Sequence, residues 1–101
     1  MNLKPGLRLS SRVCDAEVVV IKGTGDHELA CGGAPMVPVG DPDAHQGQVD
    51  DQLAGGTLLG KRYTDADGTV EILGTKPGTG TLTFDGQALA LKETKALPAS
   101  D

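Results

Sequence analysis

The sequence predicts an all-β domain, a small barrel or sandwich of about six or seven short antiparallel strands. Apolar residues alternate with polar ones through the C-terminal half of the chain. Gly and Pro account for 15 and 6 of the 101 residues, which shortens every regular segment. No stretch of about ten or more residues outside the loops keeps the 3.6-residue apolar period of a helix. Residues 1–101 are therefore expected to form a single small β domain.

The N-terminal half is expected to contain three strands. Residues 7–13 are the first candidate. Residues 18–21, Val-Val-Val-Ile, give apolar side chains to both faces of an extended segment, which predicts a strand covered on both sides. Residues 23–26 then turn the chain, and residues 27–31 are expected to return beside residues 18–21.

A long polar loop is predicted between the two halves. Residues 40–56 are rich in Asp, Gly and Gln and carry almost no apolar side chain. This composition favours disorder, or ordering by a partner, over a packed element. One helical turn is expected near residues 52–54, and residues 96–101 are expected to form a polar tail.

The C-terminal half is typical of a β-meander. Its strands are predicted at residues 69–75, 81–84 and 88–92, with a further strand at residues 61–64. The alternation predicts one apolar inner face. The residues expected on that face are Val70, Ile72, Leu82, Phe84, Leu89 and Leu91.

Two turns separate the strands of this meander. Residues 76–80, Lys-Pro-Gly-Thr-Gly, supply the first turn. Asp85-Gly86 supplies the second and is a strong two-residue hairpin signal, because both residues tolerate a positive φ. Phe84, which precedes this turn, is expected to be the largest core residue of the half.

Composition and charge exclude several classes of protein. The chain has 14 acidic and 9 basic residues, and this net charge of −5 repels phosphate backbones, so no nucleic-acid partner is expected. The longest apolar run is far shorter than the about 20 residues of a membrane span. Lys4-Pro5-Gly6 and Arg8 interrupt the region where a secretory signal would lie. A cytoplasmic protein without membrane contact is therefore expected.

The small supply of core residues favours a function in an assembly. Tyr63 and Phe84 are the only aromatic side chains, and a domain of about this length buries only some 60–70% of its unfolded surface. We therefore expect a non-catalytic accessory or binding protein, acting as a subunit of a homo-oligomer or of a larger protein complex. An enzyme acting alone is disfavoured, because the chain has neither a Gly-x-Ser-x-Gly elbow nor a phosphate-binding loop.

Cys14 and Cys31 are the main candidates for chemistry, and three interpretations stay open. A disulfide between them requires a bend, since a hairpin turn at residues 23–26 would place Cys14 about 13 Å too far along its strand. A zinc site with Cys14, His27 and Cys31 has suitable ligand types but no close ligand pair. The high burial of free cysteines in proteins favours two reduced, buried thiols.

The alternative function that follows from these residues is a metal-binding or thiol-redox protein, with His27 as the third ligand or as a base. Zinc is the cofactor that would be expected under this alternative, and no other cofactor is expected.

Two segments resemble a group of small uncharacterised proteins of actinobacterial type. They are Cys-Asp-x-Glu-Val-Val-Val at residues 14–20 and Cys-Gly-Gly-Ala-Pro-Met at residues 31–36. The run at residues 59–65 and the ending at residues 97–101 fit the same group. The resemblance draws attention to the two cysteines and the Gly32-Gly33 pair, and it implies no activity.

Overall fold

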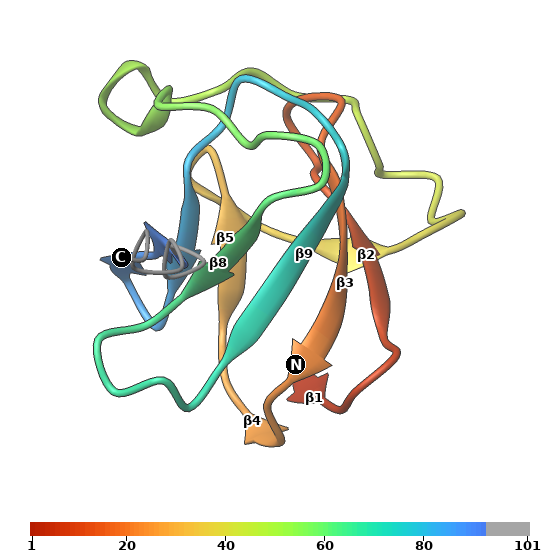
Figure 1. Cartoon of the computed structure of the whole chain (residues 1–101). Helices are drawn as coiled ribbons and strands as arrows, with labels where there is room; N and C mark the ends of the chain where they lie inside the picture. Colours follow the sequence, from red (N-terminus) through yellow and green to blue (C-terminus); the bar gives the residue numbers. More distant parts are fainter. Residues whose placement is uncertain (93–101) are drawn as a thin grey trace.

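A computed structural model describes residues 1–92 and confirms the all-β prediction. Two antiparallel sheets face each other as an open sandwich and do not close into a barrel (Figure 1). The strands are more numerous and shorter than expected, because turns interrupt them. They are β1 (Asn2–Leu3), β2 (Arg8–Ser10), β3 (Glu17–Lys22), β4 (Gly25–Asp26), β5 (Leu29–Cys31), β6 (Ala34–Pro35), β7 (Val37–Pro38), β8 (Arg62–Thr64), β9 (Glu71–Lys76), β10 (Leu82–Phe84), β11 (Gln87–Ala88) and β12 (Ala90–Leu91).

The strands divide unequally between the sheets. The larger sheet has six strands in the order β12-β8-β9-β3-β2-β7, and the smaller has four in the order β11-β10-β5-β6. A separate two-stranded ribbon of β1 and β4 lies at the lower end of the view in Figure 1. The helical turn that the sequence predicts near residues 52–54 is present as the 3-10 turn η1 (Asp51–Leu53).

The hydrophobic core lies between the two sheets. Val18, Val20 and Ile72 enter it from the larger sheet, and Leu29 and Leu82 enter it from the smaller one. All five are almost completely buried. Alternation along β3 and β9 places these side chains on the inner face, and full burial of each stabilises the fold by about 1.5–3 kcal/mol.

The predicted pairing of the two N-terminal strands is wrong. β3 pairs with β2 and β9 in the larger sheet, whereas β5 pairs with β6 and β10 in the smaller one. Residues 23–28 therefore carry the chain from one sheet to the other, and β4 pairs with β1 on the way. Both edges of β3 are occupied, one by β2 and the other by β9, which leaves no place beside it for residues 27–31.

The continuous C-terminal meander is also not formed. The Asp85-Gly86 hairpin is confirmed, since Phe84 pairs with Gln87. Residues 76–80, however, connect β9 in the larger sheet with β10 in the smaller one. Gly78 bonds in this connection to Thr57, with N–H···O distances of 2.8 and 3.1 Å, so the turn crosses the end of the sandwich.

Three side chains differ from their expected burial. The outer face of β3 is not covered, because Ile21 is 38% exposed while Val18 and Val20 are buried. Phe84 lies at the end of β10 and is only partly buried, so it is not the main core residue of its half. Leu91 is 48% exposed because β12 is an edge strand.

The loop at residues 40–56 follows one end of the sandwich. No strand lies within it, as predicted, and backbone hydrogen bonds connect it to both sheets. His45 N–H donates to Ser11 O at 2.9 Å, and Asp50 N–H donates to Gly32 O at 2.9 Å. The predicted tail at residues 96–101 lies outside the described residues. Within residues 1–92, no helix is long and apolar enough to cross a membrane.

Candidate functional site

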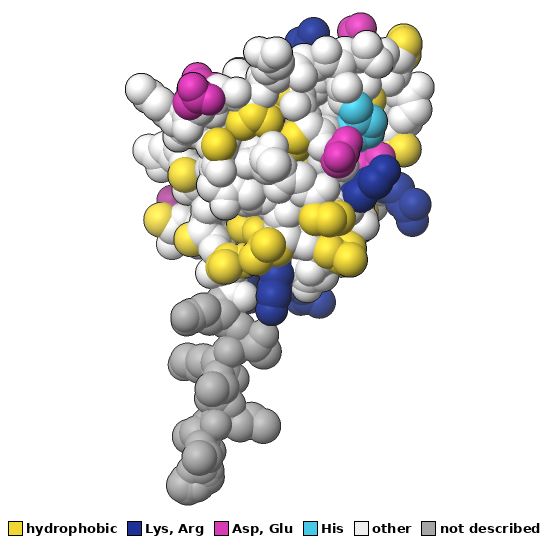
Figure 2. All heavy atoms as spheres, turned by 90° about the horizontal axis from the view of Figure 1, so that it is seen from above, with side chains coloured by type: hydrophobic (Ala, Val, Ile, Leu, Met, Phe, Trp, Pro, Cys, Tyr) yellow, Lys and Arg dark blue, Asp and Glu magenta, His cyan; other side chains and the backbone are white. Residues whose placement is uncertain are grey.

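Cys14, in the connection between β2 and β3, contacts Cys31, at the end of β5. Their Sγ atoms lie 3.7 Å apart. The β2–β3 connection lies at the upper end of the sandwich in Figure 1, the end that faces the viewer in Figure 2. The separation of about 13 Å expected from a hairpin is wrong, because the strands that bring the two residues here belong to different sheets. His27 lies before β5, at the opposite end of the molecule.

The end of β5 fixes Cys31. Its side chain is fully buried, and its backbone pairs with Leu82 of β10. The chain then turns sharply through Gly32 and Gly33, whose φ angles of 64° and 95° favour glycine. A Cβ atom on Gly32 would also lie 2.8 Å from Cγ2 of Val13, so a larger residue would displace the loop that carries Cys14.

Ser11 organises the loop that carries Cys14. Its buried Oγ accepts hydrogen bonds from the backbone N–H groups of Val13 and Cys14, both at 3.1 Å. A hydroxyl oxygen has two lone pairs and one hydrogen. While Cys14 is protonated, its thiol donates to Ser11 Oγ, with 3.3 Å between Sγ and Oγ. When Cys14 loses its proton, the hydroxyl hydrogen of Ser11 can donate to the thiolate, which lowers the pKa of Cys14.

The two thiols have different acidities. Burial raises the pKa of Cys14, but hydrogen bonds from the Ser11 hydroxyl and from the backbones of Ala16 and Gly80 outweigh it, so that this pKa lies below its ordinary value. Burial, and then the charge of Cys14, raise the pKa of Cys31 to about 12. A proton is therefore lost first from Cys14, which is half-buried, and is retained by Cys31.

Backbone rather than side chains covers the thiol pair. A Cβ atom on Gly78 would lie 2.8 Å from Cys14 Sγ and 2.5 Å from the Ala16 nitrogen. A Cβ atom on Gly80 would lie 2.9 Å from Cys31 Sγ. The buried Thr57 hydroxyl donates to Gly80 O at 2.9 Å and holds this segment in place. The two glycines thus allow the 76–80 connection to rest directly on both sulfur atoms.

His45 attaches the polar loop to the same site. Its Nδ1 atom lies 2.6 Å from the carbonyl oxygen of Cys14, and its Nε2 atom lies 3.3 Å from the Glu17 carboxylate. The sequence did not indicate that His45, Ser11 and Thr57 lie beside the thiols. Of these three residues, only Ser11 could have been found from the sequence. A serine that precedes a loop commonly accepts hydrogen bonds from the backbone N–H groups two and three residues further on.

The structure assembles only two of the three predicted zinc ligands. His27 contacts Asp85 instead, with 2.8 Å between Nδ1 and Oδ2. Within residues 1–92, no group of three or more His, Cys, Asp or Glu side chains is placed to hold a metal ion. Protein zinc sites use three or four protein ligands, so Cys14, His27 and Cys31 do not form one site in this arrangement.

Comparison of the chain with protein-family models, with curated proteins and with solved structures gave no match. The resemblance described from the sequence stays an expectation.

Proposed function

We propose that this domain is a thiol-redox protein in which Cys14 and Cys31 pass between a dithiol and a disulfide. The observation that carries the proposal is the distance of 3.7 Å between their sulfur atoms. A disulfide has an S–S distance of about 2.05 Å, so the bond requires only a local shift of the two loops. The half-buried position of Cys14 and the full burial of Cys31 support an attacking and a resolving thiol.

The reaction is an exchange with an external disulfide. The Cys14 thiolate attacks one sulfur of the substrate, the substrate S–S bond breaks, and the first substrate thiolate leaves and takes a proton from water. Cys31 then loses its proton to water and attacks Cys14 Sγ, which releases the second substrate thiolate. The substrate gains two electrons and two protons, and the protein keeps a Cys14–Cys31 disulfide.

Intact mass measured after incubation with oxidised glutathione tests this proposal. The remaining thiols are blocked with iodoacetamide in denaturant before the measurement. We expect the wild-type protein to lose two hydrogens and to take up no blocking group. Two free thiols at every ratio of oxidised to reduced glutathione would refute the proposal.

Single cysteine variants separate the two roles. Cys31→Ser lacks the resolving thiol and is expected to stop as a mixed disulfide with one glutathione. Cys14→Ser retains only the buried thiol and is expected to remain unmodified while the protein is folded. Equal glutathione uptake by the two variants would contradict the assigned order of attack.

We also propose a second function, in which the protein is a non-catalytic subunit of a homo-oligomer. Five large apolar side chains are exposed in the described part of the chain, and Figure 2 shows apolar groups spread over one end of the molecule. They are Ile21, Val39, Leu58, Leu59 and Leu91. Native mass spectrometry of the wild type and of Leu59→Asp tests this. A wild-type monomer at every concentration would exclude it.

A further inference from the structure

A hollow of about 360 Å³ lies at the end of the sandwich opposite the thiols. It is formed where the chain leaves β3, where it enters β5, and where β10 ends. Protein pockets for small molecules occupy about 300–1,000 Å³. The size of this hollow therefore suits one small molecule. It shares no residue with the thiol site, so it is independent of the proposed redox function.

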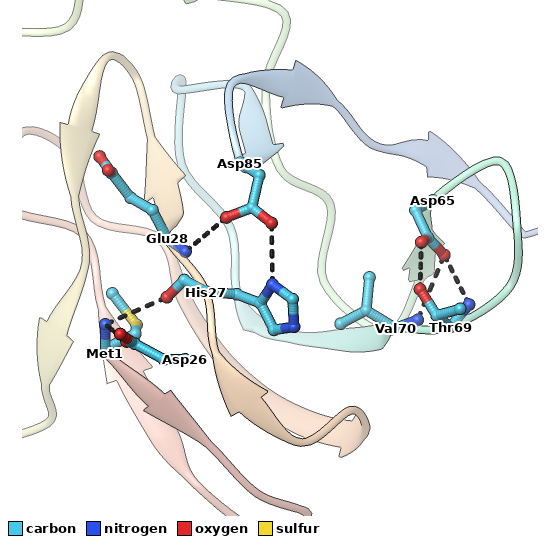
Figure 3. Close-up of polar contacts among 8 residues, drawn as sticks. All are labelled: Met1, Asp26, His27, Glu28, Asp65, Thr69, Val70 and Asp85. Atoms are coloured by element: carbon cyan, nitrogen blue, oxygen red, sulfur yellow. Dashed lines mark hydrogen bonds and ion pairs between the residues drawn. The ribbon is translucent and has the colours of Figure 1, made fainter.

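His27 presents one ring nitrogen to this hollow. Its Nδ1 atom lies 2.8 Å from Asp85 Oδ2, and the other oxygen of Asp85 accepts the N–H of Glu28 at 2.8 Å. Because a carboxylate accepts, Nδ1 carries the hydrogen, and Nε2 is left for a further partner. Figure 3 shows the ring reaching from the chain before β5 toward Val70 and Thr69, with the Asp85 carboxylate above it.

A lysine side chain lines this hollow of an acidic protein. Lys22 and His27 line it together with the hydroxyl residues Thr24 and Thr69, and none of its lining residues is acidic. The whole protein has a net charge of −5. Within residues 1–92, Lys22 takes part in no ion pair. Among the described residues, Lys22 is therefore left free for an anionic ligand, whereas the His27 ring and the Thr69 hydroxyl already bond to Asp85 and Asp65, which lie outside the lining.

The remaining walls of the hollow are apolar. Phe84 lines it, and its ring centroid lies 4.8 Å from that of His27 with an interplanar angle of 39°. Ile21 and Pro5 complete the apolar part. The incomplete burial of Phe84 and Ile21 therefore leaves apolar surface available to a ligand. Aromatic rings pack favourably in offset or tilted arrangements of this kind.

We propose that this hollow binds a small aromatic carboxylate. The ring of the ligand lies against Phe84 and Ile21, and its carboxylate accepts a hydrogen bond from the ammonium group of Lys22. Hydrogen bonds that involve a charged donor and a charged acceptor are roughly twice as strong as neutral ones. Charge therefore decides which of two ligands of similar shape is bound.

Titration with benzoate, followed by NMR of the isotope-labelled full chain, tests the proposal. Benzyl alcohol serves as an uncharged probe of similar size, and benzylamine as a cationic one. We expect saturable shifts confined to residues around Phe84 and His27, with benzoate bound about tenfold more tightly than benzyl alcohol, since 1.4 kcal/mol corresponds to a factor of ten. Benzylamine is expected to cause no saturable shift.

Two matched lysine variants locate the charge recognition. Lys22→Gln removes the cation at the hollow and is expected to weaken benzoate binding about tenfold. Lys76→Gln removes an exposed lysine at the other end of the sandwich and is expected to leave the affinity unchanged. Equal binding of benzoate and benzyl alcohol, or equal losses in the two lysine variants, would overturn the proposal. Absence of saturable shifts with benzoate would overturn it as well.

Discussion

Replacement of Ser11 by alanine removes one hydroxyl group that serves three partners. The Ser11 side chain is fully buried, accepts from two backbone N–H groups and is hydrogen-bonded to Cys14 Sγ. Ser11→Ala leaves the N–H groups of Val13 and Cys14 without this acceptor. A buried donor without a partner costs about 1–3 kcal/mol, so we expect the free energy of unfolding to fall by that amount.

The same substitution is expected to change the reactivity of Cys14. A hydrogen bond to a charged group contributes about 1.5–3 kcal/mol, which corresponds to one to two factors of ten in the equilibrium between thiol and thiolate. A more basic thiolate is also a better nucleophile, and this cancels about half of the effect on a logarithmic scale. Alkylation of Cys14 below the midpoint of its pH profile is therefore expected to slow about three- to tenfold.

The rate of iodoacetamide alkylation, measured between pH 5 and pH 10 on the reduced protein, checks this prediction. Ser10→Ala is the matched control, because Ser10 is the adjacent residue and its buried Oγ has no hydrogen-bond partner within residues 1–92. We expect Ser10→Ala to alkylate at the wild-type rate. An unchanged rate in folded Ser11→Ala, or the same slowing in Ser10→Ala, would refute the role assigned to Ser11.

Three further predictions concern stability, and chemical denaturation checks each of them. Gly78→Ala is expected to cost about 1–3 kcal/mol, because its Cβ atom would meet backbone at 2.5 Å; a neutral result would show that the 76–80 connection can move away from the thiols. Ile72→Ala is expected to cost about 2–5 kcal/mol and more than Phe84→Ala, since Ile72 is completely buried and Phe84 is not; the reverse order would place Phe84 in the core. Bonding to Lys92, and then to Arg62, lowers the pKa of Glu71 in the folded state. Its contribution to stability is therefore present above the unfolded pKa of about 4.3 and is lost as the pH falls through the folded pKa. Glu71→Gln should lose less stability than the wild type between pH 6 and pH 3, and identical losses would contradict this assignment.

Local patterns predicted the elements of the fold well. A continuous apolar run located the strand around Val18, alternation located the strand around Ile72, and the tolerance of Asp85-Gly86 for positive φ located a hairpin. Both signals depend on residues within a few positions of each other. The sheet to which a strand belongs depends on partners far along the chain, such as β3 with β9, and alternation carries no information about that choice.

The same contrast between local sequence signals and long-range strand pairing applies to the candidate site. Residue type alone selected Cys14 and Cys31 as the main candidates, with His27 as a third ligand or base. Only the crossing of residues 23–28 from one sheet to the other separates His27 from the thiols and places the sulfur atoms 3.7 Å apart. Thr57 reaches the site through its bonds with the 76–80 connection, for which the sequence has no local signal.

The backbone cover over the thiols restricts which sequences can share this site. Neither Gly78 nor Gly80 can accept a Cβ atom without moving a sulfur atom or the main chain, and the Gly32-Gly33 turn requires glycine for its φ angles. A relative that keeps the site should therefore be recognisable by a pattern, even where its core residues differ. That pattern is Ser-x-x-Cys at residues 11–14, Cys-Gly-Gly at residues 31–33 and Gly-x-Gly at residues 78–80. A chain with both cysteines but with side chains at the last two glycines would have to cover its thiols in another way.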